Sequence, residues 1–281
     1  MRTKIFVCSN SGINYTSHSN NISALPVIIK FNEEEEYVDY LDAISEAYFN
    51  RVKHSEYKPS IIPIDKERLL DYINNAIHAK YDQIVFILSS KEFIDTIDII
   101  NDAIKDFTIP INIIETNAIC YPLASMAIEA DRLLNKLGVD IETVENKIKL
   151  MNKQYNIYIY SSNKDAKTVN ASMKFADESI LPSEGGDIYT FNGELNKMDK
   201  KLKLKFDDMI SMFNKDIGND DVIPFILCNS KDSLYNDLLE VELLKIFGNL
   251  KYIKKFPIPS GIGNKFGSYS CAIGYTKFEK D

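Results

Sequence analysis

Short apolar runs alternate with amphipathic stretches through the first half of the chain. The runs have the length of strands and occupy residues 4–8, 26–31, 83–88 and 111–115. Between them, apolar side chains recur at the i, i+3, i+4 spacing of helices, in stretches that begin near residues 45, 65, 93, 121 and 140. Strands separated by helices of this length predict an α/β fold, with a mainly parallel sheet and helices on both faces.

Three residues in this half mark helix ends. Asp65 and Asp140 each stand directly before a helical pattern, where a carboxylate can accept a hydrogen bond from a backbone amide of the first turn. Gly138 follows the pattern that begins at Tyr121 and is expected to end that helix. These signals predict two consecutive helices before residue 155.

The second half has a different pattern. Strands are expected at residues 156–160 and 222–228, and a hairpin is expected from residues 179–181 and 187–191 around Glu184-Gly185-Gly186. Helices are expected at residues 198–213 and 234–247. This mixture is typical of an α+β domain, so we predict two domains, residues 1–155 and residues 156–281.

The end of the chain is rich in glycine. The segment PIPSGIGNKFGSYSCAIGY contains four of the eleven glycines, together with Lys265 and Ser268, and then continues into a strand-like run. Glycines allow a backbone to approach a ligand closely. The segment suits a turn that carries a cation and holds a small anionic group. From this segment alone, we favour the alternative of a purely structural hairpin loop.

Charge and composition exclude several classes of protein. The formal net charge of −8 argues against non-specific nucleic-acid binding and against a basic membrane-facing surface. No apolar run reaches the roughly 20 residues that span a bilayer, and the start of the chain does not resemble a signal peptide. A cytoplasmic protein without integral membrane association is expected. The four widely spaced cysteines are interpreted as buried free thiols.

No catalytic or metal-binding motif is evident. The three histidines, His18, His54 and His78, do not form a metal-binding pattern, and we interpret them as solvated surface residues. Neither a phosphate-binding P-loop nor a GxSxG motif occurs. The sequence therefore predicts neither an enzyme nor a bound metal or cofactor.

Small hydroxyl side chains follow several predicted strands. Ser89 and Ser90 end the strand at residues 83–88 and precede a predicted helix. Ligands of open parallel sheets bind at the carboxyl ends of strands, and helix N-termini there favour anions. These serines could bind a ligand oxygen or merely cap the helix. For Ser9 and Ser11, after the first strand, we favour a loop role.

The order of segments resembles the DegV family of bacterial fatty-acid-binding proteins over nearly the whole chain. The matching segments are an opening strand followed by VCSNSG, Tyr37-Val38-Asp39, Ser60-Ile61-Ile62-Pro63, Ser89-Ser90, and Ile262 to Ser268 in place of the family's closing IGxHxGPG. Ser60, a further small hydroxyl in the loop from Pro59 to Pro63, stands where the family has a threonine.

The resemblance implies a function. Family members enclose one long-chain fatty acid between two domains, with the acyl tail in an apolar tunnel, and present it to a fatty acid kinase. They are carriers that use no cofactor. The resemblance implies ligand-binding roles for Ser60, Ser90 and Lys265, with Lys265 standing where the family has histidine. Together with Ser89 and Ser268, they are the candidate ligand-binding residues. Burial of the acyl chain would supply the affinity, at about 0.8 kcal/mol per CH₂.

Two departures from the family pattern leave alternatives open. Lys91-Glu92-Phe93-Ile94 replaces the family's residues after Ser-Ser, and residues 164–178 contain no Arg-Gly-Gly. A relative that keeps the fold as a ligand-free interaction protein is one alternative. A phosphoryl-transfer enzyme is another, because the first domain also resembles that of dihydroxyacetone kinase. Such an enzyme would need a histidine at a strand end.

Overall fold

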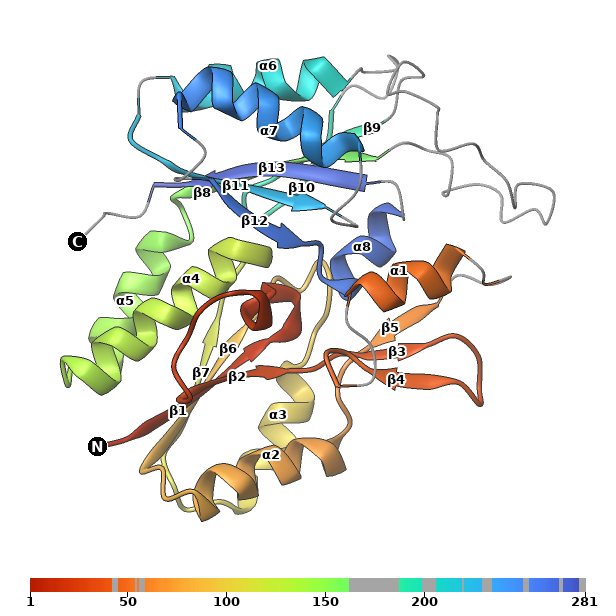
Figure 1. Cartoon of the computed structure of the whole chain (residues 1–281). Coiled ribbons are helices and arrows are strands. Elements are labelled where there is room, and N and C mark those ends of the chain that lie inside the picture. Colours follow the sequence, from red (N-terminus) through yellow and green to blue (C-terminus); the bar gives the residue numbers. More distant parts are fainter. Residues whose placement is uncertain are drawn as a thin grey trace. The chain divides into compact units, whose positions relative to one another are not determined.

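The computed structural model describes residues 1–41, 45–53, 55, 59–161, 187–198, 206–218, 220–228, 234–249, 253–267 and 270–277. The chain forms two compact units, shown in Figure 1. The first contains Met1–Asp42 and Ile61–Lys153, and the second contains Ala43–Ser60 and Gln154–Asp281. The predicted division at residue 155 places residues 43–60 in the first domain, whereas in the structure they belong to the second unit.

A four-stranded parallel sheet forms the centre of the first unit, as predicted. Its strands, in spatial order, are β2 (Ile22–Leu25), β1 (Thr3–Cys8), β6 (Gln83–Leu88) and β7 (Ile111–Glu115). Every residue of β1 and β6 is buried, as expected of strands with helices on both faces. The short β2 was not predicted from the sequence.

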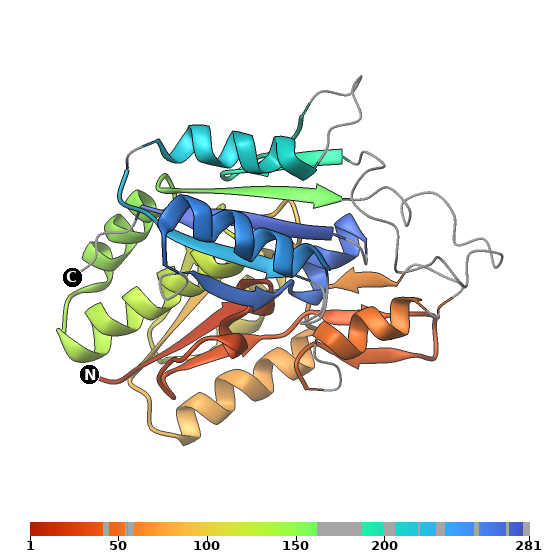
Figure 2. The same cartoon turned by 45° about the horizontal axis from the view of Figure 1, so that its top comes forward.

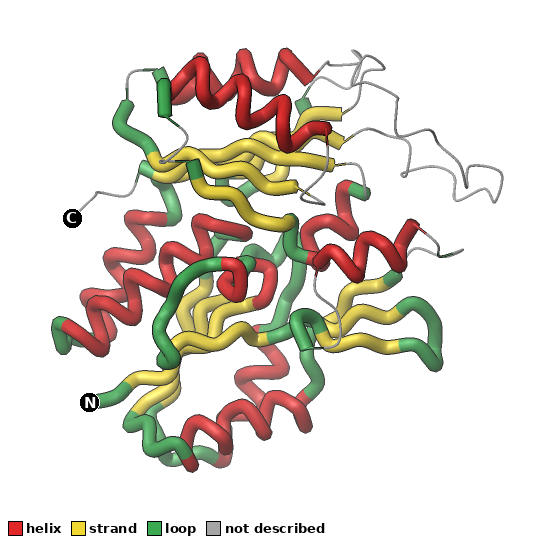
Figure 3. The backbone as a smooth tube through the Cα atoms, viewed as in Figure 1, coloured by secondary structure: helices red, strands yellow, loops and turns green. Residues whose placement is uncertain are grey.

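Helices cover both faces of this sheet, as Figures 1 and 3 show. They are α2 (Lys66–His78) and α3 (Ile97–Ala103) on one face, and α4 (Cys120–Asp131), η4 (Arg132–Lys136) and α5 (Ile141–Met151) on the other. Alternate strand residues point to opposite faces. Phe6 and Phe86 stack at 5.4 Å between ring centroids and join Leu69 and Ile73 of α2 in one apolar cluster.

The predicted helix ends are confirmed. Asp65 Oδ1 accepts a hydrogen bond from Arg68 N at 2.8 Å, and Asp140 Oδ1 accepts one from Thr143 N at 2.9 Å. Gly138 has φ +68°, in the left-handed region where glycine lacks the Cβ penalty. Local capping chemistry therefore fixes where these helices start and stop.

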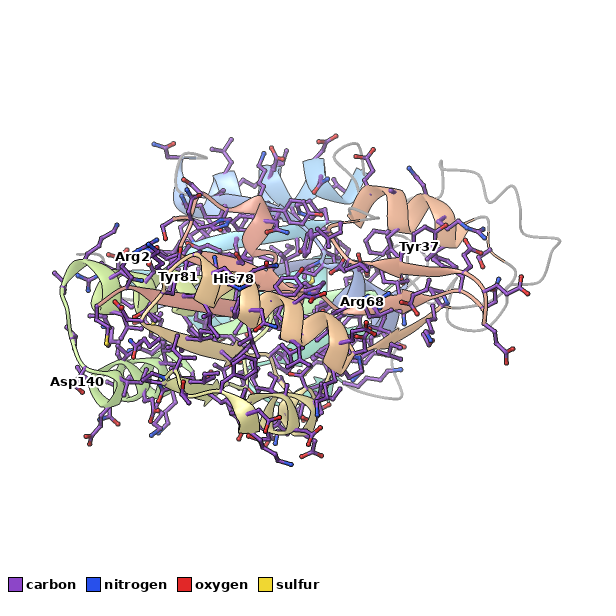
Figure 4. The ribbon with its side chains drawn as sticks, turned by 90° about the horizontal axis from the view of Figure 1, so that it is seen from below. Arg2, Tyr37, Arg68, His78, Tyr81 and Asp140 are labelled. Carbon is purple, nitrogen blue, oxygen red and sulfur yellow. The ribbon has the colours of Figure 1, made fainter. Side chains whose placement is uncertain are left out.

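Short elements complete the first unit. They are η1 (Ser9–Ser11), η2 (Ile13–Tyr15), η3 (Ile104–Asp106), and the sheet β4 (Glu36–Val38), β3 (Ile28–Lys30) and β5 (Ser60–Ile62), in which β5 starts at the junction between the units. Figure 4 labels Arg68 of α2, whose guanidinium contacts Glu36 of β4 at 2.7 Å. At the other end of α2, the same view groups His78 with Tyr81 and Arg2, and the Arg2 guanidinium lies 4.5 Å from the Tyr81 ring centroid.

A six-stranded mixed sheet forms the centre of the second unit. Its strands, in spatial order, are β10 (Leu195–Lys197), β9 (Asp187–Phe191), β8 (Tyr155–Ser161), β13 (Ser270–Thr276), β11 (Ile223–Cys228) and β12 (Lys254–Pro257). Helices α6 (Phe206–Ile217) and α7 (Leu234–Phe247) cover one face, as Figure 2 shows. Two further helices, α1 (Ser45–Lys53) and α8 (Ser260–Phe266), belong to this unit.

One sequence prediction for this unit is wrong, and part of another lies outside the described residues. The hairpin partner of β9 is β10, which pairs Leu195 with Phe191; the predicted partner at residues 179–181 lies outside the described residues. The helix expected from residue 198 starts at Phe206 among the described residues, because Met198 instead continues from β10, with its N–H donating to Ile188 O. Backbone pairing with a neighbouring strand has overridden the helical spacing of the apolar side chains.

The glycine-rich tail is also different from the prediction. Residues 260–266 form a helix, not a turn, and the following strand β13 lies inside the sheet between β8 and β11. Ile262 and Phe266, at i and i+4, are both buried and give the short helix its apolar face. Burial of that face has outweighed the low helix propensity of Gly261 and Gly263.

One carboxylate joins three elements of the second unit. Asp216 Oδ2, at the end of α6, accepts hydrogen bonds from Asn156 Nδ2 at 3.0 Å, Tyr158 OH at 2.8 Å and Tyr275 OH at 2.7 Å. Partial burial acts to raise the pKa of Asp216, but the three hydrogen bonds and nearby Lys277 outweigh it, so the pKa lies below its ordinary value. Asp216 therefore stabilises the packing of α6 against β8 and β13 in its ionised form.

This group predicts a loss of stability in acid. Because its pKa is lowered in the folded state, the contribution of Asp216 is complete above its unfolded value of about 3.9 and is lost as the pH falls through the folded value. We expect Asp216→Asn to lower the free energy of unfolding by about 1 kcal/mol at pH 7. In urea titrations, the difference from wild type should shrink below pH 4; a difference that does not depend on pH would contradict this role.

A second stability prediction concerns Gly274 of β13. A Cβ atom there would overlap the ring of Phe225, its partner on β11, and lie 2.8 Å from Asn156 O. Gly274→Ala should therefore lower the free energy of unfolding by about 1–3 kcal/mol, measured by urea unfolding.

Phe225→Leu removes the ring atoms that meet the new Cβ, so the double variant should be more stable than the sum of the single effects predicts. Additive effects would show that the ring is not the cause.

Candidate functional site

The first unit has a topological switch point between β1 and β6. The chain leaves β1 toward β2 on one side, and leaves β6 toward β7 on the other. In open α/β sheets, ligands bind at the carboxyl ends of such neighbouring strands. The residues at this position are Ser9 to Ser11 after β1, and Ser89 with Ser90 after β6.

Ser89 and Ser90 are both buried at this edge. Ser90 Oγ accepts a hydrogen bond from Glu92 N at 3.3 Å, and Ser90 N donates to Ala118 O at 3.0 Å. The hydroxyl of Ser89 is buried beside the Cys8 thiol, with which it interacts. The helix predicted to follow Ser90 directly is absent from this stretch, because α3 begins only at Ile97. An anion-binding helix N-terminus therefore does not support a site at Ser90.

Ser9 and Ser11 have structural roles, as favoured from the sequence. Ser9 Oγ accepts from Val27 N at 3.1 Å, and Ser11 Oγ accepts from Ile13 N at 3.2 Å. Between them, Asn10 is fully buried, and neither polar atom of its amide has a partner in the part of the chain that the structure describes. The only sequence signal for Asn10 is its place between two serines after a buried strand.

An acidic group lies close to this edge. Asp39 is fully buried near Cys8 and Tyr40, and the Tyr40 hydroxyl donates to Ser9 O at 3.1 Å. Burial is the main cause that raises the pKa of both the Cys8 thiol and the Tyr40 phenol, and the charge of Asp39 adds to both shifts. Protonation of Cys8 makes it a poor nucleophile. All four cysteines are buried and free, as predicted.

In the second unit, one asparagine connects the surroundings of Ser60 and Lys265. Asn264 Nδ2 donates to Pro59 O at 3.0 Å, and Tyr48 OH donates to Asn264 Oδ1 at 2.9 Å. Ser60 follows Pro59 and is exposed at the start of β5, and Lys265 follows Asn264 and is exposed in the last turn of α8. Ser60 and Lys265 thus directly follow the two residues, Pro59 and Asn264, that this hydrogen bond joins.

Close packing of α1 against α8 supports this connection. A Cβ atom at Gly263 would overlap the ring of Phe49 and lie 3.3 Å from Ile258 Cγ2. Gly263 is therefore required for the approach of two helices, whereas the sequence suggested the approach of a ligand.

The structure describes only some of the remaining predicted residues. Ser268 and His54 lie outside the described residues, and His18 and His78 are exposed. Among the described side chains, no group of His, Cys, Asp or Glu residues could hold a metal ion. Within the same ranges, none of the helices has the length and apolar character to cross a bilayer.

Several solved structures share this fold over almost their whole length. The crystal structure of a fatty acid binding DegV family protein from Streptococcus agalactiae has a TM-score of 0.76 and 14% identity, covering 99% of this chain and 100% of that chain. A Thermotoga maritima protein, described as revealing fatty acid binding function, has a TM-score of 0.74 and 18% identity, covering 98% and 99%.

A stearic acid-binding protein from Eubacterium ventriosum is similar at a TM-score of 0.71 and 14% identity, covering 98% of each chain. No curated protein matches the sequence. At these identities the structural likeness establishes the two-domain fold. The sequence model of a family described as uncharacterised proteins, DegV family, matches residues 2–166, more than half of the chain. The chain therefore belongs to the DegV family.

Proposed function

We propose that this protein is a carrier that binds one long-chain fatty acid. The observation that carries the proposal is the connection of Ser60 and Lys265 through Asn264, in a chain that shares its fold with DegV proteins described as binding fatty acids. A hydroxyl and an ammonium group are both suitable donors for a carboxylate.

The carboxyl group of the acid would bind the predicted polar residues. Lys265 and Ser60 contribute a charge and a hydroxyl from the second unit, with Ser268 following α8. Ser89 and Ser90, at the carboxyl end of β6 in the first unit, remain candidates from the sequence. A buried carboxylate needs several such donors because its loss of hydration is costly.

A carrier role fits the chemistry of the described side chains. Burial raises the pKa of the Cys8, Cys120 and Cys271 thiols, so these groups are protonated, and His18 and His78 are exposed. A phosphoryl-transfer enzyme would need a histidine at a strand end, and neither described histidine follows a strand of the parallel sheet. These observations favour binding without covalent chemistry.

The bound acid would be handed to a partner in the cytoplasm. The family resemblance supports a fatty acid kinase, which would phosphorylate the carboxyl group of the presented acid. A carrier suits this step because a long acyl chain is poorly soluble in water.

Extraction of the purified protein tests the proposal directly. Organic extracts should contain long-chain fatty acids at about one per chain, identified by mass spectrometry, and the delipidated protein should take up added palmitate. Neither recovery nor uptake of any acyl species would refute the carrier function and favour a ligand-free interaction protein.

Shortening the acyl chain should weaken binding in regular steps. Each CH₂ contributes about 0.8 kcal/mol, so the dissociation constant should rise about fourfold for each CH₂ removed between C16 and C10. Isothermal titration calorimetry of delipidated protein measures the series. A dissociation constant independent of chain length would show that the tail is not buried.

Removal of the ammonium group should weaken binding of the acid. We expect Lys265→Ala to raise the dissociation constant of palmitate about tenfold, as for loss of one charge-assisted hydrogen bond. Lys245→Ala is a matched control, because Lys245 is another exposed lysine of the second unit and pairs with Glu242 on α7. An equal effect of both substitutions would argue against a specific role for Lys265.

A further inference from the structure

We propose that Asn264 is a positioning residue that fixes the backbone before Ser60 relative to helix α8, so that Ser60 and Lys265 can contact one carboxyl group. This inference rests on the proposed fatty-acid binding and identifies a residue that sets the preference for an acid. Asn264 itself makes no contact with the ligand in this proposal. It acts through the backbone, by binding the carbonyl of Pro59 before Ser60 and by preceding Lys265 in α8.

Both polar atoms of the Asn264 amide are used in joining separate segments. Its nitrogen donates to the carbonyl of Pro59, directly before Ser60, and its oxygen accepts from the hydroxyl of Tyr48 on α1. A primary amide is suited to this task because it has a donor and an acceptor on one planar group. Asp would offer no donor to Pro59, and Leu would offer neither.

The helix that carries Asn264 is held firmly. Gly263, the preceding residue, packs so closely against Phe49 of α1 that no side chain fits there. Phe49 in turn makes an edge-to-face contact with Tyr48, with 4.9 Å between ring centroids. Packing of α1 thus fixes Tyr48, and Tyr48 fixes the orientation of the Asn264 amide.

Pro59 limits the freedom of the other partner. Its ring fixes its own φ, and it is buried at the end of the segment that precedes β5. With its carbonyl bound to Asn264, the chain has little freedom before Ser60 enters β5 at the next position. The two exposed residues Ser60 and Lys265 therefore follow backbone positions that one hydrogen bond joins.

Binding of two ligands can distinguish a positioning role of Asn264 from a role in the stability of the fold. Palmitate and methyl palmitate share the acyl chain, but only palmitate has a carboxylate. Dissociation constants of both for delipidated full-length protein, from calorimetry or displacement of a fluorescent fatty acid, give an acid-to-ester preference. A substitution that only destabilises the fold weakens both ligands equally and leaves this preference unchanged.

We expect wild type to prefer the acid, and Asn264→Ala to reduce that preference about tenfold by weakening palmitate alone. In the Asn264→Ala background, Ser60→Ala should have no further effect on the preference, because Ser60 is no longer held in place. Asn156→Ala is the matched control: Asn156 is another asparagine of the second unit that joins two elements, through Asp216, and its loss should leave the preference unchanged.

Tyr48→Phe is the second variant, and it tests the proposal even where Asn264→Ala fails to fold. It removes the donor that orients the amide, and should reduce the preference about threefold with the apolar packing of the ring retained. If wild type prefers the acid and both variants retain that preference within twofold, this inference is overturned and the proposed function stands. If wild type binds neither ligand, the proposed function itself fails; if it binds both equally, this inference fails.

Discussion

The close approach of α1 to α8 is the constraint on which the arrangement of the second unit's polar residues depends. It is possible only because position 263 has no side chain, so that the Phe49 ring can occupy the space. The contact draws residues 43–60 into the second unit, although the chain on either side of this segment belongs to the first. Ser60 is the last residue of this segment, which packs on the second unit through the contact between Gly263 and Phe49.

The two units contribute opposite kinds of polar group. In the first unit, the edge at β1 and β6 is buried and contains the carboxylate of Asp39 with the neutral side chains of Asn10 and Ser89. In the second unit, Lys265 is exposed on α8. A cation attracts an anionic head group, so Lys265 is the residue of the second unit on which the proposed function relies for charge.

Local signals predicted much of the fold, and long-range packing explains the failures. The strands β6 and β7 and the caps Asp65 and Asp140 follow from patterns within a few residues, and the structure has them where expected. The helix α8 was missed, because Gly263, one of the glycines that suggest a turn, is required by Phe49, which is remote in sequence. Asn264 escaped the sequence analysis for the same reason, since Tyr48 and Pro59 are equally remote.

The lysine at position 265 changes what the rest of the site must do. The resemblance places it where family members have histidine, whose ring is short and has few rotatable bonds. Lysine has a point charge on a flexible four-carbon stem, so it attracts a carboxylate but does not orient it. Orientation must then come from a more rigid donor, and Ser60, held by the hydrogen bond between Asn264 and Pro59, is placed to be that donor. In the proposed site, a lysine in place of the family's histidine thus increases the need for the arrangement that Asn264 maintains.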